Sequence, residues 1–432
     1  MKKIIVLLWI GFLFGCTNEN PESVLNVIAE DYVKLVLEVG QYDPNFVDAY
    51  YGPDEWKPKP LSEELSANPP YDVLLEKSSL LLGRINKISP QTLDESLRLR
   101  HLFLQKQLIA VKGRIEMLSG KNFSFDEETK VLYDVVTPDY TVEHFQSLID
   151  ELDQLLPGTG SLTERLSAFK KQFIIPEEKL DTVFHAAIRE ARKRTLDYID
   201  LPANENFKLE FVTDKPWGGY NWYKGNNFSL IQINTDLPIY IDRAIDLASH
   251  EGYPGHHVFA CLLESRLVKS KGWVEYSVYP LFSPQSLIAE GTANYGIEMA
   301  FPSDGKIKFE KEVLFPLAGL DPGQAERYYQ VLNLVSEISY VRNAAAEAYL
   351  DGEMSREETI EWLVKYALRD RRGAAQSLKF IETYRSYVIN YNVGLDMVKA
   401  YMEEKGGESA EDRWETFEYL ISTPQVPSNL VE

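Results

Sequence analysis

The chain has 432 residues, of which 44% are hydrophobic and 12% aromatic, so it is long enough to bury a large core as one domain or two lobes. Its 45 basic and 66 acidic residues give a net charge of −21, which repels phosphate backbones and argues against nucleic acid as a partner. This composition, without a repeat or a low-complexity tract, excludes a fibrous or disordered protein.

Residues 1–15 have the order of a lipoprotein-type signal peptide. Lys2 and Lys3 precede an apolar run, 4–14, that is too short to span a bilayer as a structural helix. The run ends in "LFGC", which resembles the bacterial lipobox, whose cysteine is lipidated after cleavage. We therefore expect a diacylated Cys16 to anchor the protein to a membrane of the bacterial cell envelope, on the periplasmic side or at the cell surface. An ordinary secreted protein and an uncleaved anchor are the alternatives. Cys261 would be the one remaining thiol, so no disulfide within the chain is expected.

Helical patterns dominate the chain outside its middle. Apolar residues recur at helical spacing over 23–40 and 93–120, and both stretches end at glycine. Further helical patterns cover about 141–156, 162–172 and 176–199, and helix resumes at about 241 and continues almost to the C-terminus. The sequence therefore predicts a mainly α protein, with an N-terminal helical lobe over 16–200 and the candidate chemistry in 201–432.

The middle of the chain has a different pattern. Residues 207–214 and 228–236 have the composition and partial alternation of strands, and the turn-rich, aromatic stretch "KPWGGYNWYKGNN" separates them as a predicted loop. We expect a small β-sheet beside the helix that follows. Within it, 228–236 would suit an edge strand that pairs with an extended peptide.

The stretch "HEGYPGHH", 250–257, holds three of the six histidines and one glutamate. It opens like His-Glu-x-x-His, in which two histidines four apart share a helix face and bind zinc while the glutamate reaches the water. Here His256 and His257 would lie about 9 and 10.5 Å from His250 along a regular helix. Pro254 cannot donate to the carbonyl of His250, however, and Gly255 permits unusual backbone angles. We predict a zinc helix with a Pro-Gly bulge that returns His256 to the metal. His257 is the alternative ligand or a substrate-binding neighbour, and surface histidines on a broken helix are the remaining alternative.

A third ligand is expected from "SPQSLIAEGTANYGIEM", 283–299. Glu290 lies in an otherwise apolar helical pattern, where an acid should be paired, protonated or bound to metal. Asn294 lies one turn later on the same face and is a candidate to support the ligands. Asp246, one turn before His250, could orient its imidazole. A polar stripe that faces solvent is the alternative for each segment.

These motifs resemble those of the bacterial domain-of-unknown-function 885 family over roughly 200–400. "HEGYPGHH" looks like that family's HExxPGHH motif, and "EGTANYGIE" is similar to its EGWAxYxE motif, with Thr292 in place of tryptophan. "YRSYVINYNVG" is similar to its YkxG motif, with Asn392 in place of lysine. Members are placed among the gluzincin-type zinc metallopeptidases and are largely helical and often exported. The resemblance implies a zincin-like fold in which His250, one of the two later histidines and Glu290 hold zinc, and Glu251 is the base.

The residues and the resemblance together predict a zinc metallopeptidase acting on peptides. Zinc would acidify a water, and Glu251 would take its proton and deliver it to the leaving amine. Tyr384, Tyr387 and Tyr391 repeat at helical spacing, and Tyr391 is the candidate donor to the oxyanion, although such a stripe also suits packing. Arg385 could hold a substrate carboxylate or form a structural salt bridge. The alternative from another class is a catalytically inactive envelope lipoprotein that binds peptides or another ligand at a relic of this site.

Overall fold

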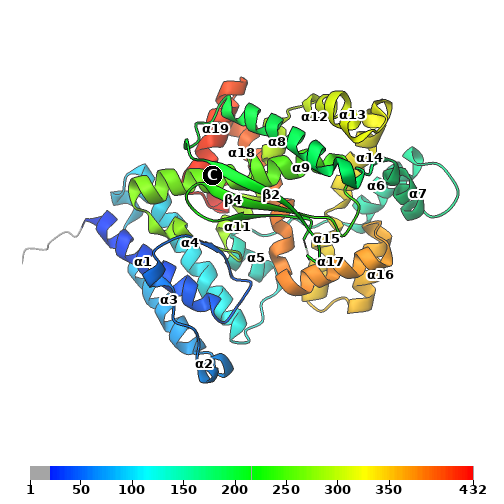
Figure 1. Cartoon of the computed structure of the whole chain (residues 1–432). Helices are drawn as coiled ribbons and strands as arrows, with labels where there is room; N and C mark the ends of the chain where they lie inside the picture. The colour runs from blue at the N-terminus through cyan, green and yellow to red at the C-terminus, as the bar shows by residue number, and fades with distance from the viewer. Residues whose placement is uncertain (1–19, 216, 432) are drawn as a thin grey trace, which may run out of the picture.

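A computed structural model of the chain describes residues 20–215 and 217–431 (Figure 1). The predicted signal peptide and Cys16 lie outside these residues. Within the described part of the chain, no helix is both long and apolar enough to cross a membrane.

Helices make up most of the described chain, which confirms the prediction of a mainly α protein. Before the strands of the middle region the helices are α1 (Pro21–Gly40), α2 (Glu63–Ala67), α3 (Tyr71–Ile85), α4 (Glu95–Leu118), α5 (Phe125–Tyr133), α6 (Val142–Leu155), α7 (Leu162–Lys170) and α8 (Leu180–Leu196). After these strands they are α9 (Asp242–Leu247), α10 (His256–Leu262), α11 (Pro284–Ala300), α12 (Gly305–Phe309), α13 (Phe315–Ala318), α14 (Ala325–Ile338), α15 (Val341–Leu350), α16 (Arg356–Tyr366), α17 (Arg371–Tyr384), α18 (Val393–Lys405) and α19 (Ala410–Ser422). Side-chain caps define the N-termini of many of these helices. In α5 and α7, for example, the capping serine hydroxyl accepts a hydrogen bond from the backbone N–H of the glutamate at N3, and the carboxylate of this glutamate accepts one from the serine backbone N–H.

A three-stranded sheet lies beside the histidine motif and crosses the middle of Figure 1. Its order is β2 (Asn206–Val212), β4 (Phe228–Asn234), β3 (Gly219–Tyr223), with β2 and β4 parallel and β3 antiparallel to β4. Two sequence predictions are therefore wrong. The aromatic loop contains strand β3, and 228–236 forms the central strand and not an edge.

The two errors have one physical cause. Glycine pairs usually mark turns, but Gly219 is needed because a Cβ there would lie 2.5 Å from a methyl group of Leu247. Its strand is held to β4 by backbone pairing and by the Trp222 indole N–H, which donates to Gln232 at 3.0 Å. With β2 on one side and β3 on the other, β4 has no free edge.

Contacts connect the residues before and after position 200, where the sequence suggested a boundary between two lobes. The division into two lobes stays a prediction. Strand β1 (Val47–Tyr50) pairs antiparallel with β5 (Val278–Pro280). Arg100 of α4 forms a bidentate ion pair with Glu275 (Nε to Oε1 2.6 Å), and both side chains are fully buried. The N-terminal helices thus share a core with the part of the chain that carries the histidine motif.

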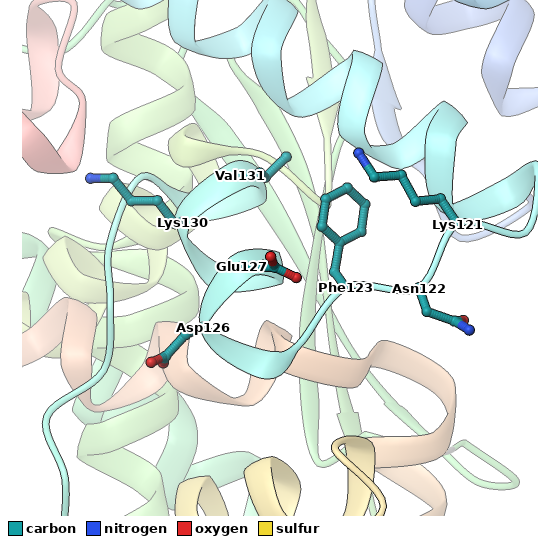
Figure 2. A pocket seen from close by; sticks show the side chains of 7 residues that line it. All are labelled: Lys121, Asn122, Phe123, Asp126, Glu127, Lys130 and Val131. Atoms are coloured by element: carbon teal, nitrogen blue, oxygen red, sulfur yellow. The ribbon is translucent and has the colours of Figure 1, made fainter.

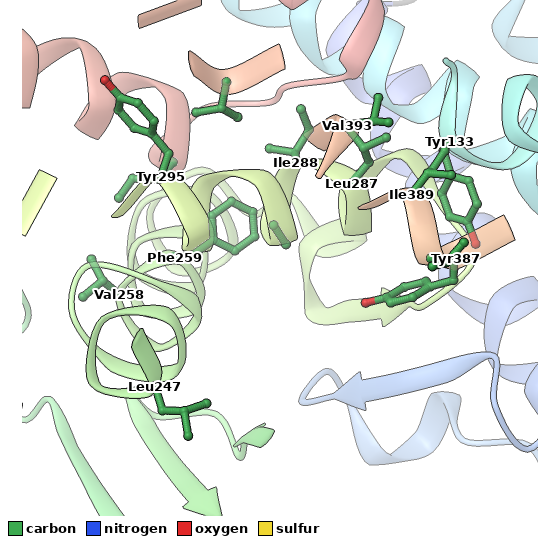
Figure 3. Close-up of a cluster of buried hydrophobic side chains, with 14 of the residues drawn as sticks. Tyr133, Leu247, Val258, Phe259, Leu287, Ile288, Tyr295, Tyr387, Ile389 and Val393 are labelled. Atoms are coloured by element: carbon green, nitrogen blue, oxygen red, sulfur yellow. The ribbon is translucent and has the colours of Figure 1, made fainter. Parts of the chain in front are cut away.

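Helix α11 runs through that core, as Figure 3 shows. It is buried around most of its circumference, and side chains such as Leu287 and Ile288 meet neighbours from α10, α18 and the 3-10 segment Arg385–Tyr391. Glu290 therefore lies in a buried helix and is only 6% exposed. The solvent-facing alternative is excluded for this acid.

Candidate metal centre

The helix that carries the histidine motif is interrupted where the sequence predicted. Helix α9 ends at Leu247, a π-helical turn covers Ala248–Gly252, and α10 begins at His256. The N–H of Gly255 donates to the carbonyl of Ser249 at 2.9 Å. A Cβ on Gly255 would lie 1.9 Å from the carbonyl oxygen of His250, so only glycine fits this turn. The extra residues of the turn change the phase of the helix and bring the later histidine back over the earlier one.

Three predicted ligands converge across the interruption. The Nε2 atoms of His250 and His256 are 3.1 Å apart, and Glu290 Oε2 lies 3.3 Å from His250 Nε2. Glu290 Oε1 lies 3.7 Å from His256 Nε2. Among the described residues this is the one group of histidine, cysteine, aspartate and glutamate side chains whose ligand atoms gather as a metal requires, all within 4.8 Å of one another.

The distances fit a tetrahedral zinc ion. Zn–N and Zn–O bonds of about 2.0–2.2 Å place neighbouring ligand atoms roughly 3.3–3.5 Å apart at tetrahedral angles. Glu290 Oε2 is buried and lacks a hydrogen-bond donor in the described chain. The three ligand atoms therefore have the spacing that the ion needs, and Glu290 Oε2 is free to coordinate it.

Burial and the charges of the three groups shift their pKa values in different directions. Burial alone would lower the pKa of His250, but Glu290 and Glu251 outweigh it and raise the pKa to about 9. Burial lowers the pKa of His256 to about 4. Burial opposes ionisation of Glu290, yet His250, His256 and Tyr387 hold its pKa below the usual range. A positive charge is thus favoured next to the carboxylate of Glu290.

His257 lies apart from this cluster and is fully buried. Its Nδ1 is 2.7 Å from Ser229 Oγ of β4, and its Nε2 is 3.0 Å from Glu205 Oε1. Glu205 is also bound by Arg192 at 2.8 Å and by the hydroxyl of Tyr253. The structure therefore places His256 in the cluster and makes His257 an anchor that ties the turn to the sheet.

Two side chains, Asn294 and Asp246, were predicted to support the histidine ligands, and the structure agrees for one of them. Asn294 Oδ1 is 2.9 Å from His250 Nδ1, and its Nδ2 donates to the carbonyl of Tyr391 at 2.7 Å. Asp246 does not contact His250, because Lys306 holds it at 2.6 Å and Arg243 at 3.4 Å. Asn294 thus orients the imidazole, and the expectation for Asp246 is wrong.

Glu251 stands next to the cluster with a free carboxylate. It is 5% exposed, and among the described residues no side chain forms a hydrogen bond or ion pair with its carboxylate. Burial, supported by the charge of Glu290 and opposed by that of His250, raises its pKa to about 7. Strand β3 passes directly over it: Asn221 donates to its backbone carbonyl at 2.6 Å, and Glu251 Oε1 lies 3.2 Å from where a Cβ on Gly219 would be.

The tyrosine stripe has divided roles. The Tyr387 hydroxyl donates to Glu290 Oε1 at 2.8 Å, so this ring supports a predicted ligand. Tyr391 is half-buried, and burial followed by the charge of Glu290 raises the pKa of its hydroxyl. Arg385 pairs with the buried Glu128 at 2.7 Å, which confirms the structural salt bridge, one of the two roles that the sequence allowed for it.

Sequence reasoning missed Asp48 and Tyr220. The Tyr220 hydroxyl of β3 donates to the carboxylate of Asp48 in β1, and burial together with Glu290 and Glu251 raises the pKa of Asp48 to about 7. A third carboxyl group therefore faces the cluster. Asp48 lies in an Asn/Pro/Gly-rich connection, and only the long-range pairing of β1 with β5 brings it there.

A surface pocket elsewhere adds nothing to this chemistry. Figure 2 shows it at the junction of α4 and α5, where Lys121, Asn122, Phe123, Asp126, Glu127, Lys130 and Val131 line it. None of these residues belongs to the cluster. The Lys121 ammonium lies 4.4 Å from the centre of the Phe123 ring.

Comparison with known proteins gives a likeness in fold. No protein-family model matches the sequence, and no curated protein matches it. A solved structure from Colwellia psychrerythraea, described as a "putative lipoprotein", is 15% identical with a TM-score of 0.52 over 83% of this chain and 65% of that one. A "putative lipoprotein of unknown function" from Shewanella oneidensis is 12% identical with a TM-score of 0.46 over 84% and 72% of the two chains. At these values only the first likeness supports a shared fold, and this chain spans 65% of the length of that protein.

Proposed function

We propose that this chain is a zinc-dependent peptidase anchored in the bacterial cell envelope. The observation that carries the proposal is the free, buried carboxylate of Glu251 beside the converging set of His250, His256 and Glu290. A structural zinc site needs no such group, whereas a hydrolytic site needs a base within reach of the attacking water. The motif resemblance to the domain-of-unknown-function 885 family and the zincin-like fold that it implies belong to this proposal.

His250, His256 and Glu290 would hold zinc, oriented by Asn294 and Tyr387. When bound, zinc would supply Lewis acidity that makes a water more acidic and polarises the substrate carbonyl. Glu251 accepts the proton of the attacking water at its carboxylate and donates it to the nitrogen of the leaving amine. One carboxylate thus carries the proton from the water to the leaving group.

Two further groups would position the substrate. Strand β3 is at an edge of the sheet and passes over Glu251, so an extended peptide would pair with β3, whereas β4 is enclosed. The Tyr391 hydroxyl is the candidate donor to the developing oxyanion.

The envelope location rests on the sequence of residues 1–16. Lipidation of Cys16 would hold the protein at a membrane surface. The description of the Colwellia psychrerythraea protein as a "putative lipoprotein" supports this part of the proposal. Because neither similar structure is described with an activity, an inactive envelope lipoprotein that binds peptides or another ligand is the second candidate.

Zinc content measured beside peptide turnover separates the two candidates. Glu251→Gln keeps the size of the side chain but cannot accept a proton, so it should retain zinc and lose roughly 10²–10⁴ in rate. His250→Ala and Glu290→Ala should lose both zinc and turnover. If the wild-type protein binds zinc but cleaves nothing in a diverse peptide library, the binding protein is the better account. Wild-type turnover by Glu251→Gln would refute its role as base.

A further inference from the structure

The two faces of strand β3 point to different surroundings. On the face toward the motif helix, the Asn221 side chain donates to the backbone carbonyl of Glu251 at 2.6 Å. Because side chains alternate along a strand, Tyr220 and Trp222 project from the opposite face of the sheet. Both are half-buried, and so are the residues of β4 that pair with them. The face that carries Tyr220 and Trp222 is therefore partly open to solvent.

Three aromatic rings form a row on this face. The ring centres of Trp217 and Tyr220 are 5.4 Å apart, and those of Tyr220 and Trp222 are 4.5 Å apart. The polar atoms of the two strand residues are already bonded, since the Trp222 indole N–H donates to Gln232 at 3.0 Å and the Tyr220 hydroxyl donates to Asp48. The rings are thus held in place, and they offer apolar surface to a ligand.

The outer edge of β3 has free backbone groups beside this row. The carbonyl of Gly218 and the N–H of Lys224 each form a hydrogen bond of 2.9 Å to β4. Hydrogen-bonded positions alternate along an antiparallel ladder, so the backbone groups of Gly219 and Asn221 point away from β4. Within the described chain, no hydrogen bond engages the backbone N–H or C=O of Gly219 or Asn221.

An extended peptide on this edge would lie beside the proposed base. A Cβ on Gly219 would be 3.2 Å from Glu251 Oε1, so the free edge passes next to that carboxylate. A peptide paired with the edge would turn alternate side chains to each face of the sheet. Neighbouring strands are about 4.7–4.9 Å apart, so the side chains on the outer face would reach the rings of Tyr220 and Trp222.

The row favours apolar side chains over polar ones. A large apolar side chain that packs on the rings removes apolar area from water, on its own surface and on theirs. A polar side chain at the same place would lose water and find no free donor or acceptor, because the indole N–H of Trp222 and the hydroxyl of Tyr220 are already bonded.

We propose that Tyr220 and Trp222, with Trp217 beside them, select peptides that carry large apolar side chains at alternate positions. This inference rests on the proposed peptidase function. It names the class of peptide that the same site accepts, and it makes these aromatic residues determinants of specificity.

The test compares matched peptides that differ at one position. Each position of a peptide library is occupied in turn by leucine, phenylalanine or glutamine. The wild-type protein should prefer leucine or phenylalanine at positions two residues apart. Trp222→Ala should lower kcat/KM for the preferred peptides roughly 10- to 100-fold, the factor that burial of one large apolar side chain supplies. It should leave the glutamine forms unchanged.

Two further variants and a control complete the comparison. Trp222→Phe should keep much of the preference, because it keeps an aromatic ring at this position. Trp217→Ala removes the neighbouring ring and carries the same comparison if Trp222→Ala does not fold. Tyr419→Ala removes a ring that is 40% exposed on α19 and should match wild type. Zinc content and melting temperature are measured for each variant, so that a lost contact is distinguished from a lost fold.

The outcomes separate this inference from the proposed function. Equal kcat/KM for apolar and glutamine forms, or a preference that both Trp222→Ala and Trp217→Ala leave unchanged, overturns the inference while the peptidase proposal stands. If nothing is cleaved, the peptidase proposal fails, and retention of the same library on immobilised wild-type and Trp222→Ala protein still tests the row. Equal retention of apolar and glutamine forms then overturns the inference. Aromatic faces also stack on sugars, so retention of a chito-oligosaccharide without retention of any peptide would overturn it too.

Discussion

Replacement of Gly255 by alanine should separate the two histidines that the turn brings together. The added Cβ would lie 1.9 Å from the carbonyl oxygen of His250 and 2.4 Å from that of Ser249. Real Cβ contacts are essentially never shorter than 3.0 Å, so the backbone must move by at least about 1 Å. Because both close atoms belong to the backbone, no side-chain rotation can relieve the contact. A shift of this size next to a ligand should weaken zinc binding by roughly 10- to 100-fold, reduce turnover about 10²-fold and cost about 1–3 kcal/mol of stability.

Zinc affinity by competition with a chromophoric chelator, together with a thermal melt, would measure these effects. Gly83→Ala is the matched control, since a Cβ there meets no atom within 4 Å and Gly83 lies inside helix α3. It should leave zinc affinity unchanged and stabilise the protein by up to about 1 kcal/mol. Wild-type zinc affinity and melting temperature in Gly255→Ala would refute the view that this turn sets the approach of His256 to His250.

Three other predictions test the surroundings of the centre. His256→Ala should abolish zinc binding, whereas His257→Ala should retain zinc and destabilise the protein by about 1–3 kcal/mol in a denaturant melt, because it leaves buried polar partners unpaired; the reverse pattern would reassign the ligand. Asn294→Ala should weaken zinc binding roughly 10- to 100-fold through loss of the contact to His250, and unchanged affinity in a chelator competition would contradict this role. The buried Glu310 carboxyl lacks hydrogen-bond partners among the described residues, and burial raises its pKa to about 8. The folded protein therefore favours the protonated form of Glu310. The stability that this proton contributes is fully present below pH 4.5 and is lost as the pH rises through 8. Glu310→Gln should therefore raise the melting temperature at pH 8.5, where the gain in unfolding free energy is up to about 4 kcal/mol, and should change the melting temperature little at pH 5. An equal change at both pH values would contradict the assignment.

The interruption of the motif helix could be predicted from sequence because its cause is local. Pro254 cannot continue the hydrogen bonding of the helix, and Gly255 follows where a backbone crosses closely. The burial of Glu290 could also be predicted from local sequence, because its neighbours along α11 are apolar on nearly every face.

The choice between the two later histidines depended on partners far away in sequence. Ser229 and Glu205 hold His257, and nothing in the motif indicates either contact. The π-helical turn that sets the phase of His256 is likewise a product of tertiary packing.

Long-range pairing also explains the remaining omissions. Asp48 reaches the site through the pairing of β1 with β5. Strand β3 was missed because Gly219 reads as a turn residue when Leu247, the side chain that excludes a Cβ, is not known to lie above it.

Anomalous diffraction at the zinc absorption edge, from crystals of the zinc-loaded protein, tests the central claim most directly. The account predicts one strong peak, about 2.0–2.2 Å from His250 Nε2, His256 Nε2 and a carboxylate oxygen of Glu290, with the carboxylate of Glu251 facing it and not bound to it. No peak at this position, or a peak between His257 and Glu205, would contradict the account.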